Sequence, residues 1–307
     1  MKSNKMSSNE NESNKFHLML PTILMLILFM VGISMNITLI RFIFMKKKKL
    51  KPIIVLILNL AIADLVNLSG MPFFIINMLE KKWLLNGLGC RLFFLLDYIG
   101  MSISMFTVTG LSFERYIEAL NLFNLYNSSN KFKLFIVYIY LIIIWLVSFF
   151  FYLPYILSLE LHQLFEESIF ICESNWSMFK LNTFFLIKLI FGFIIPFILV
   201  LIIAIRLLVY IKCSTFSTKL NQTEETALNN ENINKVAFKD YKTIKVALTI
   251  MIMFFSRFIL IWILELLQTS FDSSINVYLN VAIFFIQYIN AVINPIFYFW
   301  IVYLKTK

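Results

Sequence analysis

The sequence predicts an all-α membrane protein, a seven-transmembrane helix bundle with its N-terminus outside the cell. Of the 307 residues, 60% are hydrophobic and only 14% are charged, whereas soluble domains carry about 25% charged residues. The hydrophobic residues gather in seven runs, each long enough to cross a bilayer as a helix of about 20 residues. These runs cover residues 18–45, 53–79, 89–120, 132–159, 181–212, 236–267 and 275–304.

The distribution of lysine and arginine predicts the orientation of the bundle. Eighteen of the 27 basic residues lie on the side that an outside N-terminus makes cytoplasmic, and eight lie on the other side. Cytoplasmic loops carry such an excess of positive charge. We therefore expect residues 1–17 to be extracellular, residues 18–304 to form the membrane domain, and residues 305–307 to be a very short cytoplasmic end. The lysines within 46–51 also suit an anionic inner leaflet, so membrane lipids are an expected partner.

The third run carries polar residues on one helix face. At about 100° and 1.5 Å per residue, Asp97 lies five turns, or about 27 Å, from Arg115 on the same side. Ser104 lies between them, and Cys90 lies beyond Asp97 on nearly the same face. Charge inside a membrane is expensive and usually functional, so this face is not expected to meet lipid.

Marks in separate runs resemble those of the rhodopsin-like (class A) G-protein-coupled receptors. The resemblance covers nearly the whole chain, and the marks occur in the family's order. They are Asn36, the stretch Leu60-Ala61-Ile62-Ala63-Asp64, Cys90, the triplet Glu114-Arg115-Tyr116, Trp145, Cys172, Pro196 and the stretch Asn294-Pro295-Ile296-Phe297-Tyr298. The resemblance implies a multi-pass receptor of the plasma membrane that couples to a heterotrimeric G protein.

The resemblance also implies a disulfide between Cys90 and Cys172. Both cysteines fall at predicted outer ends of runs, where an oxidising compartment permits such a bond. On the same side, Asn11 and Asn175 begin glycosylation sequons.

The resemblance implies a sodium-binding polar cluster around the acid of the second span. An aspartate at this depth must be paired, neutralised or ion-bound. The family's partners for that acid are all present, so the expected set is Asp64, Ser104, Asn290 and Asn294. The alternative is a water-filled hydrogen-bond network without a specific ion. No other cofactor is expected.

A lock at the cytoplasmic end follows from the same resemblance. Arg115 can pair with Glu114 beside it and with Asp240, which opens the sixth run. Breaking these pairs would let the sixth helix swing outward and admit a G protein, a contact to which Tyr116 belongs. In the alternative, Asp240 is a solvated charge favoured by the helix dipole.

The switch that drives this movement is assigned to the sixth and seventh spans. Asn294, Pro295 and Tyr298 belong to it, because a proline removes a backbone hydrogen bond and creates a hinge. In the sixth span, Phe254 and Phe258 take part. The family's FxxCWxP pattern is altered there: Phe258 stands for the tryptophan and Leu260 for the proline.

The ligand site is expected in the outer third of the bundle. Among the receptors that the chain resembles, an acid at this position binds a protonated amine, so the resemblance implies that Asp97 binds a basic group. A charge-assisted hydrogen bond would hold that group, and aromatic side chains would add cation–π attraction. In the alternative, Asp97 pairs internally with Lys188. The expected ligand-binding residues are Asp97, Tyr98, Met101, Lys188, Trp262, Glu265 and Tyr288.

A peptide with a basic group is the expected ligand. Asp97, Lys188 and Glu265 give the pocket both signs of charge, and Pro72 follows Asp64 by eight residues, as in peptide-receptor relatives. The nearest likeness is to somatostatin/opioid-type receptors. Two alternatives stay open, a biogenic-amine receptor and a seven-span receptor that captures ligand without signalling.

Other classes of function are disfavoured. The net charge of +10 is compatible with nucleic-acid binding, but the apolar composition argues against it. A transporter would show internal repeats and broken helices, which the sequence lacks. An enzyme is not expected either, since the chain has no HExxH motif and its two histidines lie at loop edges.

Overall fold

The structure is a computed structural model. It describes residues 2–45, 51–80, 82–121, 129–163, 170–220, 255, 259–260, 263 and 273–306. Its elements are α1 (Lys2–Met45), α2 (Pro52–Glu80), α3 (Gly87–Asn121), α4 (Asn130–Leu157), β1 (Leu159–Gln163), β2 (Phe170–Ser174), α5 (Met178–Leu189), the π-helix η1 (Ile190–Ile194), α6 (Ile195–Leu220) and α8 (Ser273–Thr306).

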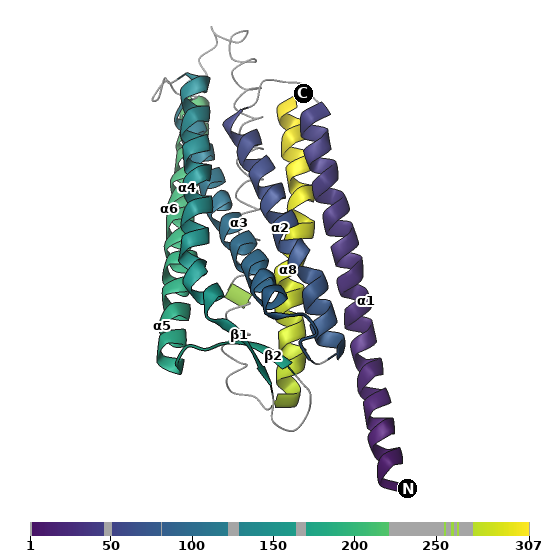
Figure 1. Ribbon diagram of the computed structural model, residues 1–307. Helices are drawn as coiled ribbons and strands as arrows, with labels where there is room; N and C mark the ends of the chain where they lie inside the picture. The colour runs from purple at the N-terminus through teal and green to yellow at the C-terminus, as the bar shows by residue number, and fades with distance from the viewer. Residues whose placement is uncertain are drawn as a thin grey trace.

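The long helices lie roughly side by side in one bundle (Figure 1). Within the described part of the chain, six helical segments are long and apolar enough to cross a membrane, and α5, η1 and the start of α6 form one of them. The sixth predicted run, 236–267, falls almost wholly outside the described residues. Only Phe255, Ile259, Leu260 and Ile263 of that run are described, and all four are helical.

The helices α2 and α3 form the centre of the bundle. In the apolar stretch of α2, 67% of the residues are buried, against 11% in α4 and 11% in the span of α5 and α6. The helix α8 packs against α1 and α2 on one side, and α4 and α6 pack against α3 on the other. Residues that α2 and α3 present to their neighbours are therefore shielded from lipid.

A short antiparallel hairpin covers one end of the bundle. Its strands β1 and β2 pair so that Leu161 lies opposite Cys172. We call this end of the bundle the outer end, and the end that carries Arg115 the inner end. Figure 1 places the N-terminus at the outer end and the C-terminus at the inner end.

The π-helix interrupts the fifth span just before a proline. The N–H of Ile195 bonds to the carbonyl of Ile190, five residues back, and Pro196 follows. A proline cannot donate a backbone hydrogen bond, and its ring clashes with the preceding turn. The wider π-turn accommodates this defect, as single π-bulges do in other long helices.

A glycine permits the close approach of α2 and α3. A Cβ added at Gly100 would lie 2.7 Å from the backbone nitrogen of Asn67 and 2.9 Å from its Cα. Backbone atoms cannot give way as a flexible side chain can. The position of α3 against α2 therefore depends on the missing side chain at Gly100.

We predict that Gly100→Ala lowers stability by about 1–3 kcal/mol, the usual cost of overpacking a buried contact. The measurement is thermal unfolding of the purified protein in detergent. The matched control is Gly192→Ala, because a Cβ at Gly192 would meet no atom within 4 Å. Equal melting temperatures for the two variants would contradict the close contact.

Candidate functional site

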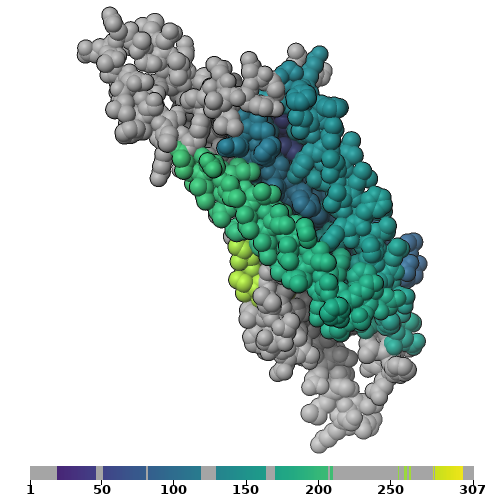
Figure 2. Space-filling model, turned by 90° about the vertical axis from the view of Figure 1, so that its left-hand side faces the viewer, coloured from purple at the N-terminus to yellow at the C-terminus, as the bar shows by residue number. Residues whose placement is uncertain are grey.

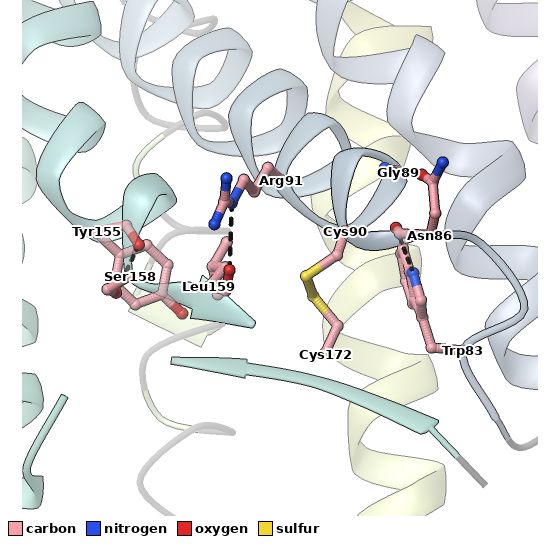
Figure 3. The surroundings of a disulfide bond; sticks show 9 residues. All are labelled: Trp83, Asn86, Gly89, Cys90, Arg91, Tyr155, Ser158, Leu159 and Cys172. Atoms are coloured by element: carbon pink, nitrogen blue, oxygen red, sulfur yellow. Dashed lines mark hydrogen bonds between the residues drawn. A yellow bond between two sulfur atoms is a disulfide. The ribbon is translucent and has the colours of Figure 1, made fainter. Parts of the chain in front are cut away.

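A disulfide ties the hairpin to the outer end of α3. Cys90 and Cys172 are bonded, with their Cα atoms 5.8 Å apart (Figure 3). The Nε of Arg91 donates to the carbonyl of Leu159 in β1 at 3.2 Å. The backbone N–H of Trp83 donates to the carbonyl of Phe170 in β2 at 2.7 Å. The disulfide predicted from the sequence is thus present, and both strands are held against the bundle.

The acid of the predicted ligand site lies between α3 and α8. Asp97 is buried, and its Oδ1 accepts hydrogen bonds from Gln287 Nε2 at 2.6 Å and from the hydroxyl of Tyr288 at 3.3 Å. Gln287 was missed by the sequence analysis. The signal that would have found it is an amide side chain next to Tyr288, in the part of the span between Val281 and Asn290 that is otherwise apolar or aromatic.

Aromatic rings form the wall next to this acid. The ring of Tyr98 lies 5.3 Å from that of Tyr152 and 5.5 Å from that of Tyr155. The Nζ of Lys188 lies 4.3 Å from the centre of the Tyr98 ring, a cation–π contact. Met101 lines a small cavity here together with Lys188 and Tyr152. Five of the seven predicted ligand residues therefore lie in this one region. They are Asp97, Tyr98, Met101, Lys188 and Tyr288.

The acid of α2 is bonded to α3 and α8 at mid-depth. Asp64 is 3% exposed, and it accepts hydrogen bonds from Ser104 Oγ at 3.1 Å and from Asn294 Nδ2 at 3.0 Å. Asn290 lies one turn before Asn294 on the same helix. One carboxylate therefore joins three helices.

The donor set suits a hard monovalent cation better than a transition metal. The carboxylate of Asp64 and the hydroxyl of Ser104 are oxygen ligands, which hard cations prefer. Among the described residues, no group of three or more His, Cys, Asp and Glu side chains is placed to hold a metal ion. With a single acid, the residues fit sodium.

An asparagine of α1 compensates for the proline of α8. Because Pro295 has no N–H, the carbonyl of Ala291 loses its helical donor. The Nδ2 of Asn36 donates to that carbonyl at 2.8 Å, and also to Gly32 O at 2.9 Å. Asn36 is fully buried, so this bond fastens α1 to the turn of α8 that precedes Pro295.

A second polar joint fastens α4 to the centre. The Nε1 of Trp145 donates to Asn59 Oδ1 at 2.9 Å, and Asn59 Nδ2 donates to Thr107 Oγ1 at 2.8 Å. These bonds connect α4, α2 and α3, and they give the fourth-span tryptophan a structural role. Sequence analysis singled out Trp145 but not its two partners.

The arginine at the inner end is paired within its own helix. Arg115 is 3% exposed; its Nε donates to Glu114 Oε2 at 2.6 Å, and its guanidinium also forms an ion pair with Glu118. Glu118 was missed by the sequence analysis, although a spacing of three residues on a helix predicts contact. Tyr116 is half-buried and packs against the apolar cluster at the inner end, which we call the inner core and which includes Leu56, Val108 and Tyr298.

The remaining predicted residues divide into two groups. Tyr298 is buried in the inner core, and Asn175 is exposed at the end of β2, where its Nδ2 donates to Glu160 at 2.9 Å. The other group lies outside the described residues or, for Asn11, has no described side chain. It consists of Asn11, Asp240, Phe254, Phe258, Trp262 and Glu265.

Comparison with known proteins identifies a family that matches most of the chain. The family described as "7 transmembrane receptor (rhodopsin family)" matches residues 35–298. That range contains the inner arginine, both cysteines of the disulfide and the acids of α2 and α3.

Individual relatives match over shorter ranges. The urotensin-2 receptor of Homo sapiens is 42% identical over 66 residues, which are 22% of this chain and 17% of that receptor. Opsin-5 of Homo sapiens is 34% identical over 24% of this chain and 21% of its own length. Neuropeptide FF receptor 2 of Rattus norvegicus is 24% identical over 79% of this chain and 60% of its own. Each match thus spans less than two thirds of the relative.

We predict that Asn36→Ala lowers stability by about 1–3 kcal/mol, because it leaves the buried carbonyl of Ala291 without a donor. Thermal unfolding in detergent measures the change. Ser34→Ala is the control, since its exposed hydroxyl donates to the carbonyl of Met30 one turn back in α1. If Asn36→Ala unfolds at the same temperature as Ser34→Ala, Asn36 does not support the turn before Pro295.

Proposed function

The chain belongs to the rhodopsin family of seven-transmembrane receptors, and we propose that it binds an extracellular peptide with a basic group and activates a heterotrimeric G protein. The family match confirms the predicted resemblance and the seven-helix bundle. The protein is accordingly a multi-pass receptor of the plasma membrane and not an enzyme. An extracellular N-terminus is part of the proposal, supported by the lysine distribution and by the disulfide at the outer end.

The buried acid between α3 and α8 is the observation that carries the proposed ligand chemistry. Asp97 lies on the stretch of α3 that follows Cys90, toward the end that the hairpin covers. Gln287 and Tyr288 hold its carboxylate in place. An ammonium or guanidinium group that reaches this carboxylate would form a charge-assisted hydrogen bond and approach the ring of Tyr98.

The other charge in this region favours a peptide over a simple amine. Lys188 stands over Tyr98 and can meet a carboxylate or carbonyl of the same ligand. A peptide offers both signs of charge, whereas a biogenic amine offers one. The name of the rat relative also refers to a neuropeptide. The Asp97–Tyr288 contact alone would suit an amine equally well, so the amine receptor stays the alternative.

Release of the inner arginine is the proposed route to the G protein. In the resting state Arg115 is held by Glu114 and Glu118, and we propose that Asp240 of the sixth span shares this role. Ligand binding would shift the switch residues Phe254, Phe258, Asn294, Pro295 and Tyr298. The sixth helix would then move outward, and Arg115 and Tyr116 would meet the G protein.

The cluster around Asp64 is proposed to hold a sodium ion in the resting state. Asp64 would supply the charge, and Ser104, Asn290 and Asn294 the neutral oxygens. Because Asn294 precedes the proline of α8, closing of this cluster on activation would shift the turn before that proline.

We predict that Asp97→Asn weakens binding of the activating ligand by about 10- to 100-fold, because a hydrogen bond to a charged group is worth about 1.5–3 kcal/mol. A library of basic peptides and amines is first screened by nucleotide exchange on a G protein, and the best compound is then titrated. Glu173→Gln, an acid exposed on β2, is the control. Equal affinity for Asp97→Asn and the control would remove Asp97 from the ligand site. Specific binding without any exchange would favour the non-signalling receptor.

We predict that sodium lowers agonist affinity at least about fivefold, a coupling typical of allosteric sites, and that Asp64→Asn abolishes this effect. Agonist titrations with sodium and with potassium at equal ionic strength measure it. The melting temperature of the purified protein provides a second readout, which sodium should raise in wild type only. If sodium and potassium change the agonist affinity of the wild-type receptor equally, Asp64 belongs to a hydrogen-bond network without a specific ion.

A further inference from the structure

A groove of about 740 Å³ lies at the inner half of the bundle, away from the proposed ligand site. Its walls come from α3, α4 and α6, and the start of α2 closes one end. Figure 2 shows α3, in blue, between the teal α4 and the green α6. The volume lies within the range of about 300–1,000 Å³ that is usual for small-molecule pockets.

The walls of this groove are apolar. Phe113, Ile136 and Ile202 line it and are 46–54% exposed. Two of its hydroxyl groups are bonded inside the protein, since Thr109 donates to Met105 O at 3.1 Å and Tyr140 donates to Phe106 O. The walls between these two bonded hydroxyl groups therefore suit a hydrocarbon chain.

The inner end of the groove carries charge. Lys51 at the start of α2 and Lys133 at the start of α4 both line it, and so do Glu114 and Glu118. The two glutamates are paired with Arg115. Glu114 and Glu118 carry two negative charges, and Arg115, Lys51 and Lys133 carry three positive ones, so these five groups have a formal net charge of +1.

We propose that this groove binds an anionic phospholipid of the inner leaflet, with an acyl chain along the apolar walls and the phosphate at Lys51 and Lys133. An amphiphile with one negative end matches both halves of the groove. Basic pockets between helices on the cytoplasmic side of membrane proteins bind such headgroups. The bound lipid would brace α4 against α3 next to the pairs of Arg115. The site does not depend on which ligand the outer pocket takes.

The test uses the full chain in phosphatidylcholine nanodiscs. They contain a trace of phosphatidylserine with a photoreactive diazirine on its acyl chain. After illumination, labelled peptides are mapped by mass spectrometry. We expect label on the stretches that contain Phe113 and Ile136, and competition by unlabelled phosphatidylserine but not by inorganic phosphate. The single variants Lys51→Ala and Lys133→Ala should each reduce the labelling about fivefold.

Two further variants keep the test decisive. Lys131→Ala is the matched control, because Lys131 lies at the same end of α4 but does not line the groove. It should label like wild type. Ile202→Trp should fill the groove and remove the label while both lysines remain. Equal labelling by a phosphatidylcholine probe, with no effect of the lysine variants, would mean annular lipid only and would overturn the proposal. Label confined to the exposed face of α4, at Ile139, would do the same.

Discussion

A polar or charged side chain inside a membrane must find its partners within the protein, and this constraint explains how the bundle is held together. Asp64 and Asp97 each accept bonds from other helices, and Arg115 is paired along α3. Apolar contacts alone would tolerate sliding between helices, because lipid chains are as apolar as leucine. The directional bonds of these buried groups instead fix which residues face each other.

The same bonds connect the outer pocket with the inner end. The helix α3 carries Asp97, Ser104 and Arg115 in sequence, and α8 carries Tyr288 and Asn294, which bond to the two acids. A ligand group that hydrogen-bonds to Asp97 would therefore compete with Gln287 and Tyr288 of α8 for the same carboxylate. A shift of α8 would disturb the bond of Asn294 to Asp64 and the turn before Pro295, where the bond from Asn36 replaces the missing helical one. Buried hydrogen bonds thus run along α3 and α8 from Asp97 to Asp64.

Residue spacing along a single helix predicts which side chains share one helix face. The periodicity of α3 put Cys90, Asp97, Ser104 and Arg115 on one face, and all four are buried. Hydrophobic run lengths predicted spans, six of which have a counterpart among the helices that the structure describes. The cysteine depths and the family pattern predicted the disulfide. The family pattern supplied the partners Ser104 and Asn294 of Asp64 on other helices. Partners outside that pattern were missed, because the pairing of Gln287 with Asp97, or of Asn59 with Trp145, depends on helix rotation and crossing. The contact of Glu118 with Arg115 follows from a helical spacing of three residues, but Glu118 lies outside the Glu114-Arg115-Tyr116 motif.

The proposed signalling mechanism requires that Glu114 and Glu118 restrain Arg115 in the absence of ligand. Nucleotide exchange on a G protein without ligand tests this restraint most directly. The measurement is the rate of nucleotide exchange on a purified G protein, driven by the reconstituted receptor. If α3 restrains Arg115 through its own acids, Glu114→Gln/Glu118→Gln will raise the ligand-free rate above wild type, while the exposed Glu173→Gln will not. A well-folded double variant with the wild-type rate, together with a ligand that still activates both, would contradict this lock.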